Sequence, residues 1–347
     1  MVENFYVQTN EGISVQEAKT CLLCGKEGVI IYKGLRDRLL KAPGIWSLMR
    51  CPNCDLVWVN PRPISSEIKL YEEYYTHQID RPQKKRFEAL RKAIKAKILK
   101  REFGYCGDAQ GGALSQVLSL ISPLREIVGA NVMYLKANEK GRLLDVGCGN
   151  GRFLAQMRQF GWQVKGVEPD HKAAKLAREY YELEVFEGTL EKASFPDESF
   201  DVITMNHVIE HVMDPMQTLV ECKRILKAEG KLVVVTSNIQ SLGRHLFGKN
   251  WRGWEIPRHL FLFSSQSLKA LCERAGFKVQ RLLTSSKIAP FMWTESLLIH
   301  RNKRLLNSYK RLGVWLKLSG LAFWMIEYAI CRWGAPQGEE IVLEAVK

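Results

Sequence analysis

The stretch RLLDVGCGNG, residues 142–151, decides the fold of this chain. Its apolar start, with Leu143, Leu144 and Val146, predicts the end of a buried strand, and the residues after Gly151 predict a helix. Glycines in the turn between them let the backbone approach a ligand that a Cβ atom would exclude. The first turn of the helix offers N–H groups that have no partner within the helix. The stretch therefore predicts a nucleotide-binding loop between a strand and a helix.

The spacing of the glycines narrows the choice of ligand. A dinucleotide fingerprint has glycines at its first, third and sixth positions, but here the third glycine is Gly151, at the fifth position, and Arg152 occupies the sixth. Asp145, which precedes the first glycine, suits a ligand with a positive ammonium group better than a pyrophosphate. The alternative is a glycine turn that only connects a strand to a helix.

The composition predicts a folded protein with about two domains. Of the 347 residues, 46% are hydrophobic and 25% are charged, as in ordinary globular proteins. The 51 Lys and Arg residues against 37 Asp and Glu residues give a net charge of +14, which favours anionic partners such as nucleic acid, a membrane surface or phosphorylated substrates. The N-terminus lacks the pattern of a signal peptide, so we expect a cytoplasmic protein in which the nine cysteines do not form a disulfide scaffold.

Two Cys-x-x-Cys pairs near the N-terminus predict a metal site. Cys21 and Cys24 form the first pair, and Cys51 and Cys54 form the second. Each turn can aim two thiolates at one ion, so the two turns complete a tetrahedral Cys₄ shell for Zn²⁺. Because four protein ligands leave no open position, we expect the zinc to be structural. The redox alternative requires one pair only, in a thioredoxin-like βαβ context that the sequence lacks.

The chain divides into four predicted segments. A polar tail is expected first, followed by the zinc-binding module, a linker region of basic amphipathic helices, and an α/β domain in which strands and helices alternate. The module ends in a strand and a Ser-capped helix that leads to Tyr71, Tyr74 and Tyr75. The segments are 1–20, 21–76, 77–139, with helices at 84–103 and 114–128, and 140–347.

The α/β part places further candidate ligand contacts after its strands. Glu168 stands at the carboxyl end of the second strand, where an acidic side chain can accept hydrogen bonds from both hydroxyls of a ribose. Thr189 and Leu190 form the turn where an adenine would rest. Several nucleoside cofactors share this ribose contact, so Glu168 indicates a nucleoside without naming it. Strands are expected at 143–146, 163–167, 185–187, 200–205 and 232–235, and a helix from Asp214 to Gly230.

Four segments in this order resemble class I S-adenosylmethionine (SAM) methyltransferases: DVGCGNG at 145–151, VEPD at 167–170, SFPDESFDVI at 194–203 and NHVIEHVMDP at 206–215. The resemblance extends over residues 140–285 and is greatest to ubiquinone-type O-methyltransferases and bacterial sugar methyltransferases. It implies a Rossmann-like α/β sheet of seven strands, with a final antiparallel strand at 341–346. The expected SAM-binding residues are Asp145, Gly147, Cys148, Gly149, Gly151, Glu168, Pro169, Thr189, Leu190 and Asn206.

The N-terminal part adds to this resemblance. CPNCDLVWVNPRP, residues 51–63, followed by a Tyr-rich segment, is similar to the zinc-binding module that precedes such domains in sugar C-methyltransferases and in proteins of surface-polysaccharide gene clusters. The resemblance therefore implies a small zinc-ribbon module before the methyltransferase sheet.

Candidate catalytic residues follow the fourth strand, at the sheet edge where ligands bind in open α/β folds. SAM carries its methyl group on a sulfonium, so transfer needs mainly alignment and a deprotonated acceptor. We predict His207 as the general base, with Glu210 and His211 beside it; the alternative is that His211 packs under the sheet and caps the next turn. Related O-methyltransferases hold a divalent cation here with two carboxylates and a histidine, but His207 stands in place of the first carboxylate.

Two further segments suggest partners. The loop WRGWEIPRHL, residues 251–260, is similar to a W…PRHL…FS loop of the polysaccharide-associated relatives, and its aromatic faces and guanidinium groups suit a sugar ring and a phosphate. The expected substrate contacts are Trp251, Arg252, Trp254, Arg258 and His259, and the alternative is a lid whose tryptophans pack inward. An insertion at 296–333 has a basic first half and an apolar second half. Leu318–Ile326 is too short to span a bilayer, so the insertion favours an interfacial segment on an anionic membrane, with a dimer interface or a substrate lid as alternatives.

Together these features predict a cytoplasmic SAM-dependent methyltransferase, peripheral on the inner membrane face, that acts on a hydroxyl or carbon of a sugar, nucleotide-sugar or lipid-linked glycan precursor. A homo-oligomer is compatible with this prediction. One rival is an RNA methyltransferase, which the charge and the zinc ribbon suit. Against it, NHVIEH replaces the Asn/Asp-Pro-Pro-aromatic motif of base-amine methyltransferases. A second rival is a non-catalytic, membrane-associated assembly factor that keeps the SAM fold as a scaffold.

Overall fold

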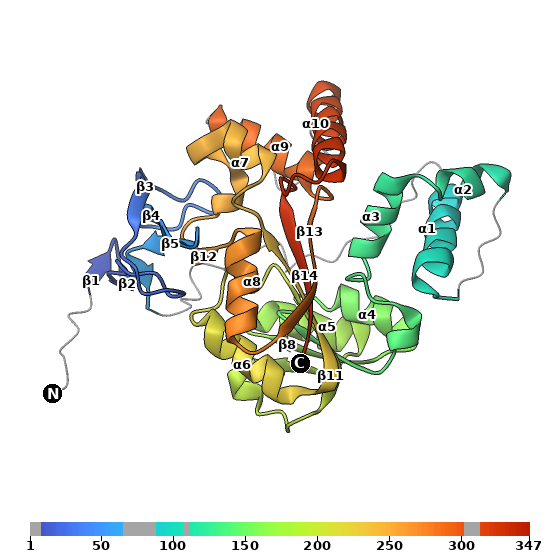
Figure 1. Ribbon diagram of the computed structural model, residues 1–347. Coiled ribbons are helices and arrows are strands. Elements are labelled where there is room, and N and C mark those ends of the chain that lie inside the picture. The colour runs from blue at the N-terminus through green and yellow to red at the C-terminus, as the bar shows by residue number, and fades with distance from the viewer. Residues whose placement is uncertain (1–7, 65–87, 107–111, 302–312) are drawn as a thin grey trace. The chain divides into compact units, whose positions relative to one another are not determined.

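The computed structural model describes residues 8–64, 88–106, 112–301 and 313–347 (Figure 1). The helix expected to lead to Tyr75 and most of the basic half of the 296–333 insertion lie outside the described residues. The chain forms two compact units. The first comprises Met1–Tyr74, Asn206–Val220 and Val234–Ala345, and the second comprises Tyr75–Met205, Glu221–Val233 and Val346–Lys347.

Seven strands form the largest sheet, in the order β13-β14-β11-β10-β7-β8-β9. β7 pairs in parallel with β10 and with β8, and β8 pairs in parallel with β9. β7 and β10 are almost continuously buried, as parallel strands covered on both faces should be. The order and the parallel pairs confirm the predicted Rossmann-like α/β sheet. The strands are β7 Arg142–Val146, β8 Gln163–Glu168, β9 Val185–Glu187, β10 Phe200–Asn206, β11 Leu226–Ser237, β13 Lys278–Ser285 and β14 Glu340–Val346.

Helices alternate with these strands, and their ends follow local capping. Asp170 caps α5, because its Oδ1 accepts a hydrogen bond from N of Ala173 at 2.8 Å. Ser264 caps α8 in a reciprocal hydrogen-bonding pattern with Ser267. The helices of this part are α4 Arg152–Gln159, α5 His171–Tyr181, α6 Pro215–Ile225, α7 Leu242–Phe247 and α8 Ser265–Arg274, with 3₁₀ turns at Ala137–Glu139, Glu191–Ala193, Gly248–Asn250 and Arg252–Trp254.

Two predicted helices differ in extent from the structure. The helix that begins at Pro215 ends at Ile225 instead of near Gly230, because the chain from Leu226 is already extended and N of Lys347 donates to O of Gly230 at 3.1 Å. The helix predicted at 114–128 is two helices, α2 Ala113–Leu118 and α3 Ser122–Ala130, because Ile121 is extended and Pro123 starts the second one. α1, Glu88–Phe103, confirms the basic helix before them.

The N-terminal residues form two small sheets. One has the order β1-β2-β6 and the other β12-β5-β4-β3, so the strand β12, far along the chain, completes the sheet of the cysteine-containing segment. Residues 8–16 were expected to be a tail, but Ile13 and Val15 are buried in β2, and their alternation with Ser14 and Gln16 gives the strand an apolar face. The strands are β1 Gln8–Asn10, β2 Ile13–Gln16, β3 Val29–Leu35, β4 Trp46–Arg50, β5 Val57–Asn60, β6 Arg62–Pro63 and β12 Phe261–Leu262.

The described residues between β13 and β14 include two helices. These are α9, Ala289–His300, and α10, Val314–Arg332. They pack closely, since the rings of Trp293 and Phe323 stack at 4.6 Å and a Cβ on Gly320 would lie 3.1 Å from O of Pro290. α10 is longer than the apolar run Leu318–Ile326, which by itself is too short to span a bilayer. Its 19 residues have a mean hydropathy of 1.3 and are long and apolar enough, by length and composition, to cross a membrane.

Candidate functional site

The glycine loop joins β7 to α4 at the carboxyl end of β7. Gly147, Gly149 and Gly151 have positive φ values of 69°, 54° and 79°. At Gly151 a Cβ atom would lie 2.6 Å from Cδ1 of Leu183 and 2.8 Å from Cβ of Ala177, so both the backbone and the packing require glycine. α4 begins at the next residue, which brings a helix N-terminus to the loop. The predicted strand, loop and helix are confirmed.

Glu168, the last residue of β8, is fixed against this loop. N of Gly149 donates to its Oε2 at 2.8 Å, and N of Asp170 donates to its Oε1 at 2.9 Å. The side chain is only 8% exposed. Backbone N–H groups thus orient both carboxylate oxygens at the carboxyl end of β8, where a ribose binds in open α/β sheets.

Asp145 lies in the register of β7 opposite Thr204 of β10. Its Oδ1 accepts a hydrogen bond from Oγ1 of Thr204 at 2.7 Å. Burial raises the pKa of Asp145 to about 7, and the nearby Glu168 carboxylate acts in the same direction. A positive ligand group beside Asp145 would favour its ionised form. This pair of acids therefore suits a cationic ligand better than an anionic one.

The other expected SAM-binding residues differ in exposure. Cys148 and Leu190 are buried, whereas Pro169, Thr189 and Asn206 are exposed. Burial raises the pKa of Cys148 well above its ordinary value, so this side chain stays a neutral thiol. N of Gly188 donates to O of Glu168 at 3.0 Å, which holds the turn before Thr189 against the end of β8. The contacts of these residues with SAM stay predictions.

His207 is held between two buried carboxylates. Its Nδ1 lies 3.0 Å from Oε1 of Glu210, and its Nε2 lies 3.0 Å from Oε1 of Glu340. Burial alone would lower the pKa of His207, but the hydrogen bonds to Glu210 and Glu340 outweigh it and raise the pKa to about 10. The ring is therefore an imidazolium at neutral pH, with both N–H groups donating. This geometry argues against the predicted general base, because a base needs a lone pair that His207 does not offer.

Glu210 and His211 lie with His259 in a second, compact group. One ligand atom of each lies within 4.8 Å of the others. The imidazole rings of His211 and His259 are 4.7 Å apart and nearly perpendicular. Burial lowers the pKa of both histidines, that of His259 to about 4, so both rings are neutral at neutral pH. The structure thus brings two of the three predicted catalytic residues next to a residue that was predicted for substrate contact.

The 251–260 loop is packed inward, as in the alternative interpretation of its tryptophans. Trp251 is 2% exposed and donates from Nε1 to Oε2 of Glu339 at 2.9 Å. Trp254 is 3% exposed and meets the ring of Tyr32 edge-on at 5.7 Å. Nε1 of Trp254 donates to O of Gly248 at 2.8 Å. Contact of these rings with a sugar stays a prediction, but packing already explains their presence.

The cationic residues of the loop also have partners within the protein. Arg258 is fully buried and donates to Asp37 at 2.7 and 3.1 Å and to Glu255 at 3.2 Å. Arg252 donates to Glu255 at 2.5 Å. The Arg258–Asp37 pair fastens the loop to the chain after β3, and buried ion pairs of this kind are costly to break on one side. The expected phosphate contacts of Arg252 and Arg258 stay predictions.

Comparison with known proteins agrees with the glycine loop. Residues 121–282 match a family described as "Methyltransferase domain". A ubiquinone biosynthesis O-methyltransferase from Haemophilus ducreyi is 32% identical over 133 residues, which are 35% of this chain and 55% of that protein. A protein of the same name from Maricaulis maris is 33% identical over 146 residues, 38% of this chain and 57% of that protein.

Residues 121–282 form a class I SAM-dependent methyltransferase domain. The chain spans about half the length of the curated relatives it matches. Among solved structures, a SAM-dependent methyltransferase from Thermotoga maritima is 22% identical, with a TM-score of 0.43, and the match covers 76% of this chain and 100% of that one.

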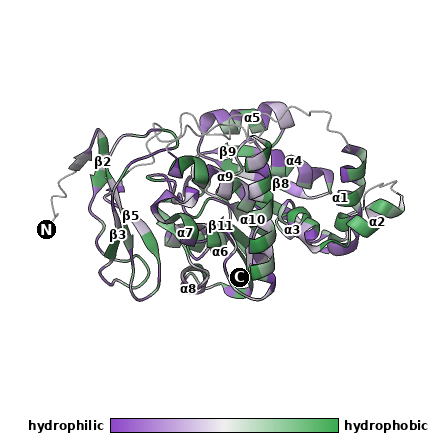
Figure 2. Cartoon of the chain, turned by 90° about the horizontal axis from the view of Figure 1, so that it is seen from above, coloured by the Kyte–Doolittle hydropathy of each residue, from purple (hydrophilic) through white to green (hydrophobic). Residues whose placement is uncertain are grey.

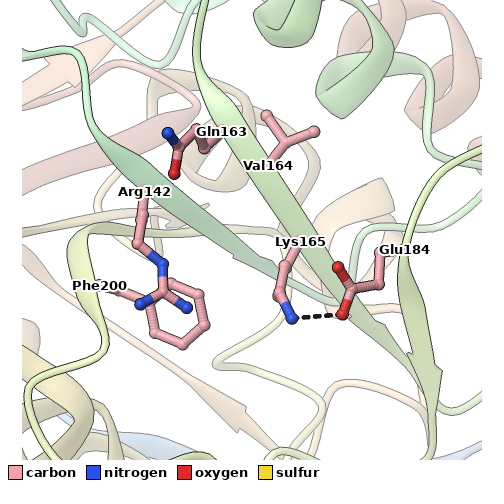
Figure 3. A pocket seen from close by; sticks show the side chains of 6 residues that line it. All are labelled: Arg142, Gln163, Val164, Lys165, Glu184 and Phe200. Atoms are coloured by element: carbon pink, nitrogen blue, oxygen red, sulfur yellow. Dashed lines mark hydrogen bonds and ion pairs between the residues drawn. The ribbon is translucent and has the colours of Figure 1, made fainter.

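A pocket of about 420 Å³ in the methyltransferase domain is not the cofactor site (Figure 3). Arg142, Gln163 and Phe200, which line it, are the first residues of β7, β8 and β10. The pocket therefore lies at the opposite ends of these strands from the glycine loop, whereas cofactors of open α/β sheets bind at the carboxyl ends. The guanidinium of Arg142 lies 5.5 Å from the Phe200 ring centroid, and Lys165 pairs with Glu184.

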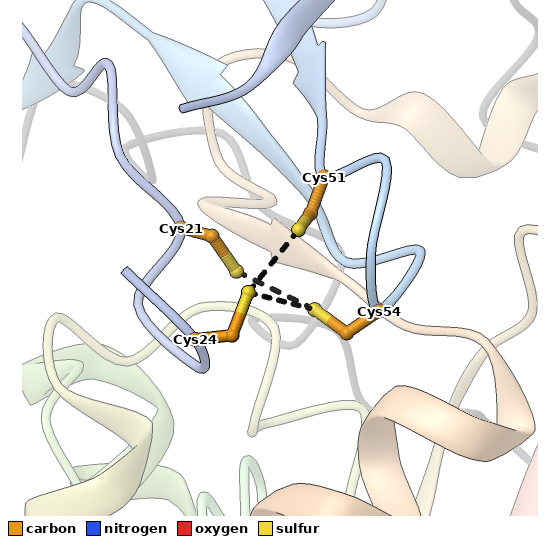
Figure 4. A group of neighbouring side chains, drawn as sticks. All are labelled: Cys21, Cys24, Cys51 and Cys54. Atoms are coloured by element: carbon orange, nitrogen blue, oxygen red, sulfur yellow. Dashed lines mark hydrogen bonds between the residues drawn. The ribbon is translucent and has the colours of Figure 1, made fainter. Parts of the chain in front are cut away.

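The four N-terminal cysteines meet as predicted (Figure 4). Sγ of Cys21 lies 3.5 Å from Sγ of Cys54, and Sγ of Cys24 lies 3.4 Å from that of Cys51. Both turns are alike, because N of Gly25 donates to O of Cys21 and N of Asp55 donates to O of Cys51. Four sulfurs around Zn²⁺ with Zn–S bonds of about 2.3 Å would lie about 3.8 Å apart, so the four thiols fit a tetrahedral ion.

Several residues of these sites carry little or no signal in the sequence. Asp55, with a φ of 62°, occupies in the second Cys-x-x-Cys turn the position that Gly25 occupies in the first. The second turn is therefore not marked by a glycine in the sequence. Glu340 precedes the predicted last strand, and only the structure shows that it contacts His207. Asp37, in a segment without periodicity, carried no signal for its pairing with Arg258. Thr204 was signalled weakly, as a polar residue within a buried apolar strand.

Proposed function

We propose that this protein transfers a methyl group from SAM to a hydroxyl or carbon of a sugar, nucleotide-sugar or lipid-linked glycan precursor. The single observation that carries the methyl-transfer part is the glycine loop with the fixed Glu168 carboxylate beside it. Glu168 would hold the ribose hydroxyls of SAM, and Asp145 would favour its positive groups. SAM supplies an electrophilic methyl group on a sulfonium.

The residues after β10 would act on the acceptor. We propose that Glu210 and His211 take this role in place of His207, because the ring of His207 is charged and bonded on both sides. His211 presents Nδ1 to O of Arg258 at 3.0 Å, so in the neutral ring the lone pair is on Nε2. Glu210 has a pKa of about 2, since the hydrogen bond and the charge of His207 outweigh the effect of burial, and stays ionised.

The acceptor class rests on weaker support than the cofactor. The zinc-module resemblance favours sugars, whereas the relatives from Haemophilus ducreyi and Maricaulis maris are named for ubiquinone biosynthesis, which makes a phenolic hydroxyl on a prenylated ring the second candidate. Mass spectrometry with labelled SAM separates the two. Incubation with nucleotide sugars, polyprenyl-linked sugars and prenylated phenols should label a sugar. Labelling of the phenol alone would replace our proposal with the second candidate.

We further propose that α10 brings the protein to an anionic membrane, where a lipid-linked acceptor would be carried. Large apolar side chains are exposed along this helix. Its ribbon is largely green, the colour of hydrophobic residues, in Figure 2. Glu327, its acidic residue, is instead buried and accepts a hydrogen bond from N of Glu339. Lys317 and Arg332 add positive charge, which attracts anionic lipids. The exposed apolar residues are Val314, Trp315, Leu318, Leu321, Met325 and Ile326.

Vesicle sedimentation tests the membrane contact. The protein should sediment with phosphatidylglycerol vesicles and much less with neutral phosphatidylcholine vesicles. The double variant Trp315→Ser, Leu318→Ser should lose this binding. The matched control Leu114→Ser, Val117→Ser removes two large apolar side chains that are also exposed, at 60% each on α2, and should keep the binding. Equal sedimentation of both variants would refute the role of α10.

The rivals are tested with the same protein. Binding of SAM without transfer to any tested acceptor, including RNA, would favour the assembly factor. RNA binding with a steep dependence on salt, together with methylation of the RNA, would favour the RNA methyltransferase.

A further inference from the structure

We propose that the pocket at the amino ends of β7, β8 and β10 binds a small organic carboxylate (Figure 3). Its volume of about 420 Å³ lies within the range of small-molecule sites, about 300–1,000 Å³. β7 has five residues, so at a rise of about 3.3 Å per residue the pocket lies about 13 Å along this strand from the glycine loop. The carboxylate is therefore not the methyl acceptor, and the site does not depend on the proposed function.

Arg142 supplies a guanidinium group whose N–H groups face a ligand. N of Arg142 donates to Oδ2 of Asp201 at 2.7 Å, and Nζ of Lys227 donates to Oδ1 of Asp201 at 2.8 Å, so both oxygens of this carboxylate are occupied. Among the described residues, the guanidinium forms no hydrogen bond or ion pair and contacts the Phe200 ring, whose centroid lies 5.5 Å away. The buried ring supports the guanidinium on one side and leaves its N–H groups available.

The charges around the pocket favour an anion with one negative charge. Lys165 pairs with Glu184, and Lys227 pairs with Asp201, so these four charges cancel in pairs. The positive charge of Arg142 remains. A carboxylate matches it, because a guanidinium can donate two parallel hydrogen bonds to the two oxygens of one carboxylate. A doubly charged phosphate would need a second cation, and both lysines are already paired.

The other lining residues suit the rest of such a ligand. Gln163 is the partner of Arg142 in the register of β7 and β8, so the two residues are neighbours across the strands. Figure 3 shows the Gln163 amide on the same side of the pocket as the Arg142 guanidinium, with the Lys165–Glu184 pair across from them. Within the described ranges, this amide has no hydrogen-bond partner and can donate to the ligand. Val164 adds apolar surface, which fits a carboxylate on an apolar body.

The alternative is that the Arg142 side chain only covers the Phe200 ring. A covering role uses the CH₂ groups and the flat face of the guanidinium, and it does not involve the N–H groups. The two interpretations therefore differ in what these N–H groups do when a carboxylate is present. An experiment that observes the Arg142 side chain directly separates them.

Nuclear magnetic resonance of the full-length protein with ¹⁵N-labelled arginine tests the site. The Nε–H signal of Arg142 is identified by its absence in Arg142→Lys, which keeps a positive charge above the Phe200 ring. This signal should shift with added benzoate and saturate with a Kd of about 1 mM or lower, as expected for a ligand of this size. Benzamide has the same shape without the charge and should bind at least about tenfold more weakly. No shift with benzoate, or an equal affinity for benzamide, would overturn the proposal.

Benzoate affinities of variants, measured from the signals of the ligand, locate the binding. Arg142→Gln should weaken benzoate binding by about tenfold or more, and Gln163→Leu should weaken it less, because it removes a neutral donor. Arg274→Gln is the matched control, since Arg274 is an exposed arginine on α8, outside the pocket. If Arg142→Gln binds benzoate as tightly as Arg274→Gln does, the proposal is overturned. Displacement of benzoate by an equal concentration of inorganic phosphate would also overturn it.

Calorimetry with SAM distinguishes this site from the cofactor site. Saturating benzoate should leave the affinity for SAM unchanged, because the two sites lie at opposite ends of β7. Competition between benzoate and SAM would overturn the proposal, since it would place benzoate at the glycine loop. A protein that binds benzoate at Arg142 but does not bind SAM would support this site and contradict the proposed function.

Discussion

Replacing His207 with Gln should destabilise the protein strongly and change its response to pH. Glu210 is 0% exposed and Glu340 is 2% exposed, and each contacts one nitrogen of His207 at 3.0 Å. Removing one member of a buried ion pair costs about 3–5 kcal/mol, because it leaves a charge without a partner. Gln can donate to only one of the two carboxylates with comparable geometry. We therefore expect a loss of about 3–5 kcal/mol in the free energy of unfolding at pH 6.5.

The pH dependence follows from the direction in which folding moves the pKa of His207. This pKa is raised from 6.5 to about 10 in the folded protein. The stabilisation by His207 is therefore fully present below pH 6.5 and is lost as the pH rises from 6.5 to about 10. One pKa unit corresponds to about 1.4 kcal/mol, so the loss is on the order of a few kcal/mol. His207→Gln should lack this loss.

Urea unfolding followed by tryptophan fluorescence at pH 6.5 and pH 9.5 measures both effects. His171→Gln is the matched control, because His171 contacts Glu187 at 2.8 Å but is exposed, and its effect should stay within about 0.5 kcal/mol. Two results would refute the charged contacts of His207 with Glu210 and Glu340. Either the His207→Gln protein is as stable as the control, or it loses as much stability with rising pH as the unmodified protein.

Three further substitutions or treatments test other parts of the structure. Gly151→Ala should lower the free energy of unfolding in urea by about 2–5 kcal/mol, because φ is positive and the added Cβ would contact Leu183. The control Gly12→Ala has a φ of 92° but nothing within 4 Å of an added Cβ, so it should lose only the contribution from the positive φ. Arg258→Ala should lower the free energy of unfolding in urea by about 3–5 kcal/mol, because it leaves the buried Asp37 without its partner. The control Arg36→Ala removes an exposed pair with Glu11 and should lower it by at most about 1 kcal/mol. Removing zinc with a chelator should lower the melting temperature by about 5–10 °C, equivalent to about 3 kcal/mol; an unchanged melting temperature in protein shown to have held zinc would contradict a structural role.

The fold of the methyltransferase domain could be predicted from local patterns. Buried strands such as 143–146 are short apolar runs next to glycine or acidic residues, and these signals lie within a few residues of each other. The cofactor loop was equally local, because its spacing, Gly151 and Glu168 can all be read from the chain. The paired Cys-x-x-Cys turns predicted the cysteine cluster for the same reason.

Pairings between distant segments could not be predicted. Asp37 and Arg258 are 221 positions apart, and Glu340 is 133 positions from His207. The sequence shows a polar residue in each place but not which partner neutralises it. The residue types predicted a base at His207 and substrate contacts at Trp251, Trp254 and Arg258, and these roles stay predictions. The structure adds their partners within the protein, which are two carboxylates for His207 and packed neighbours for the other three.

The strands of residues 8–16 were missed for a related reason. Ile13 and Val15 are two apolar positions in a polar stretch, too few to form a periodic pattern. Their burial depends on pairing of β2 with β6, which brings Val15 opposite Pro63. Short strands of this kind are specified by their partners more than by their own residues.

SAM binding at the glycine loop underlies every function proposed for this protein, and isothermal titration calorimetry measures it. The pure protein should bind one SAM or S-adenosylhomocysteine per chain. Glu168→Ala should weaken that binding by about 10- to 150-fold, since a hydrogen bond to a charged group contributes about 1.5–3 kcal/mol. Absence of SAM binding by the folded protein, or equal affinity of Glu168→Ala, would contradict a SAM site at this loop.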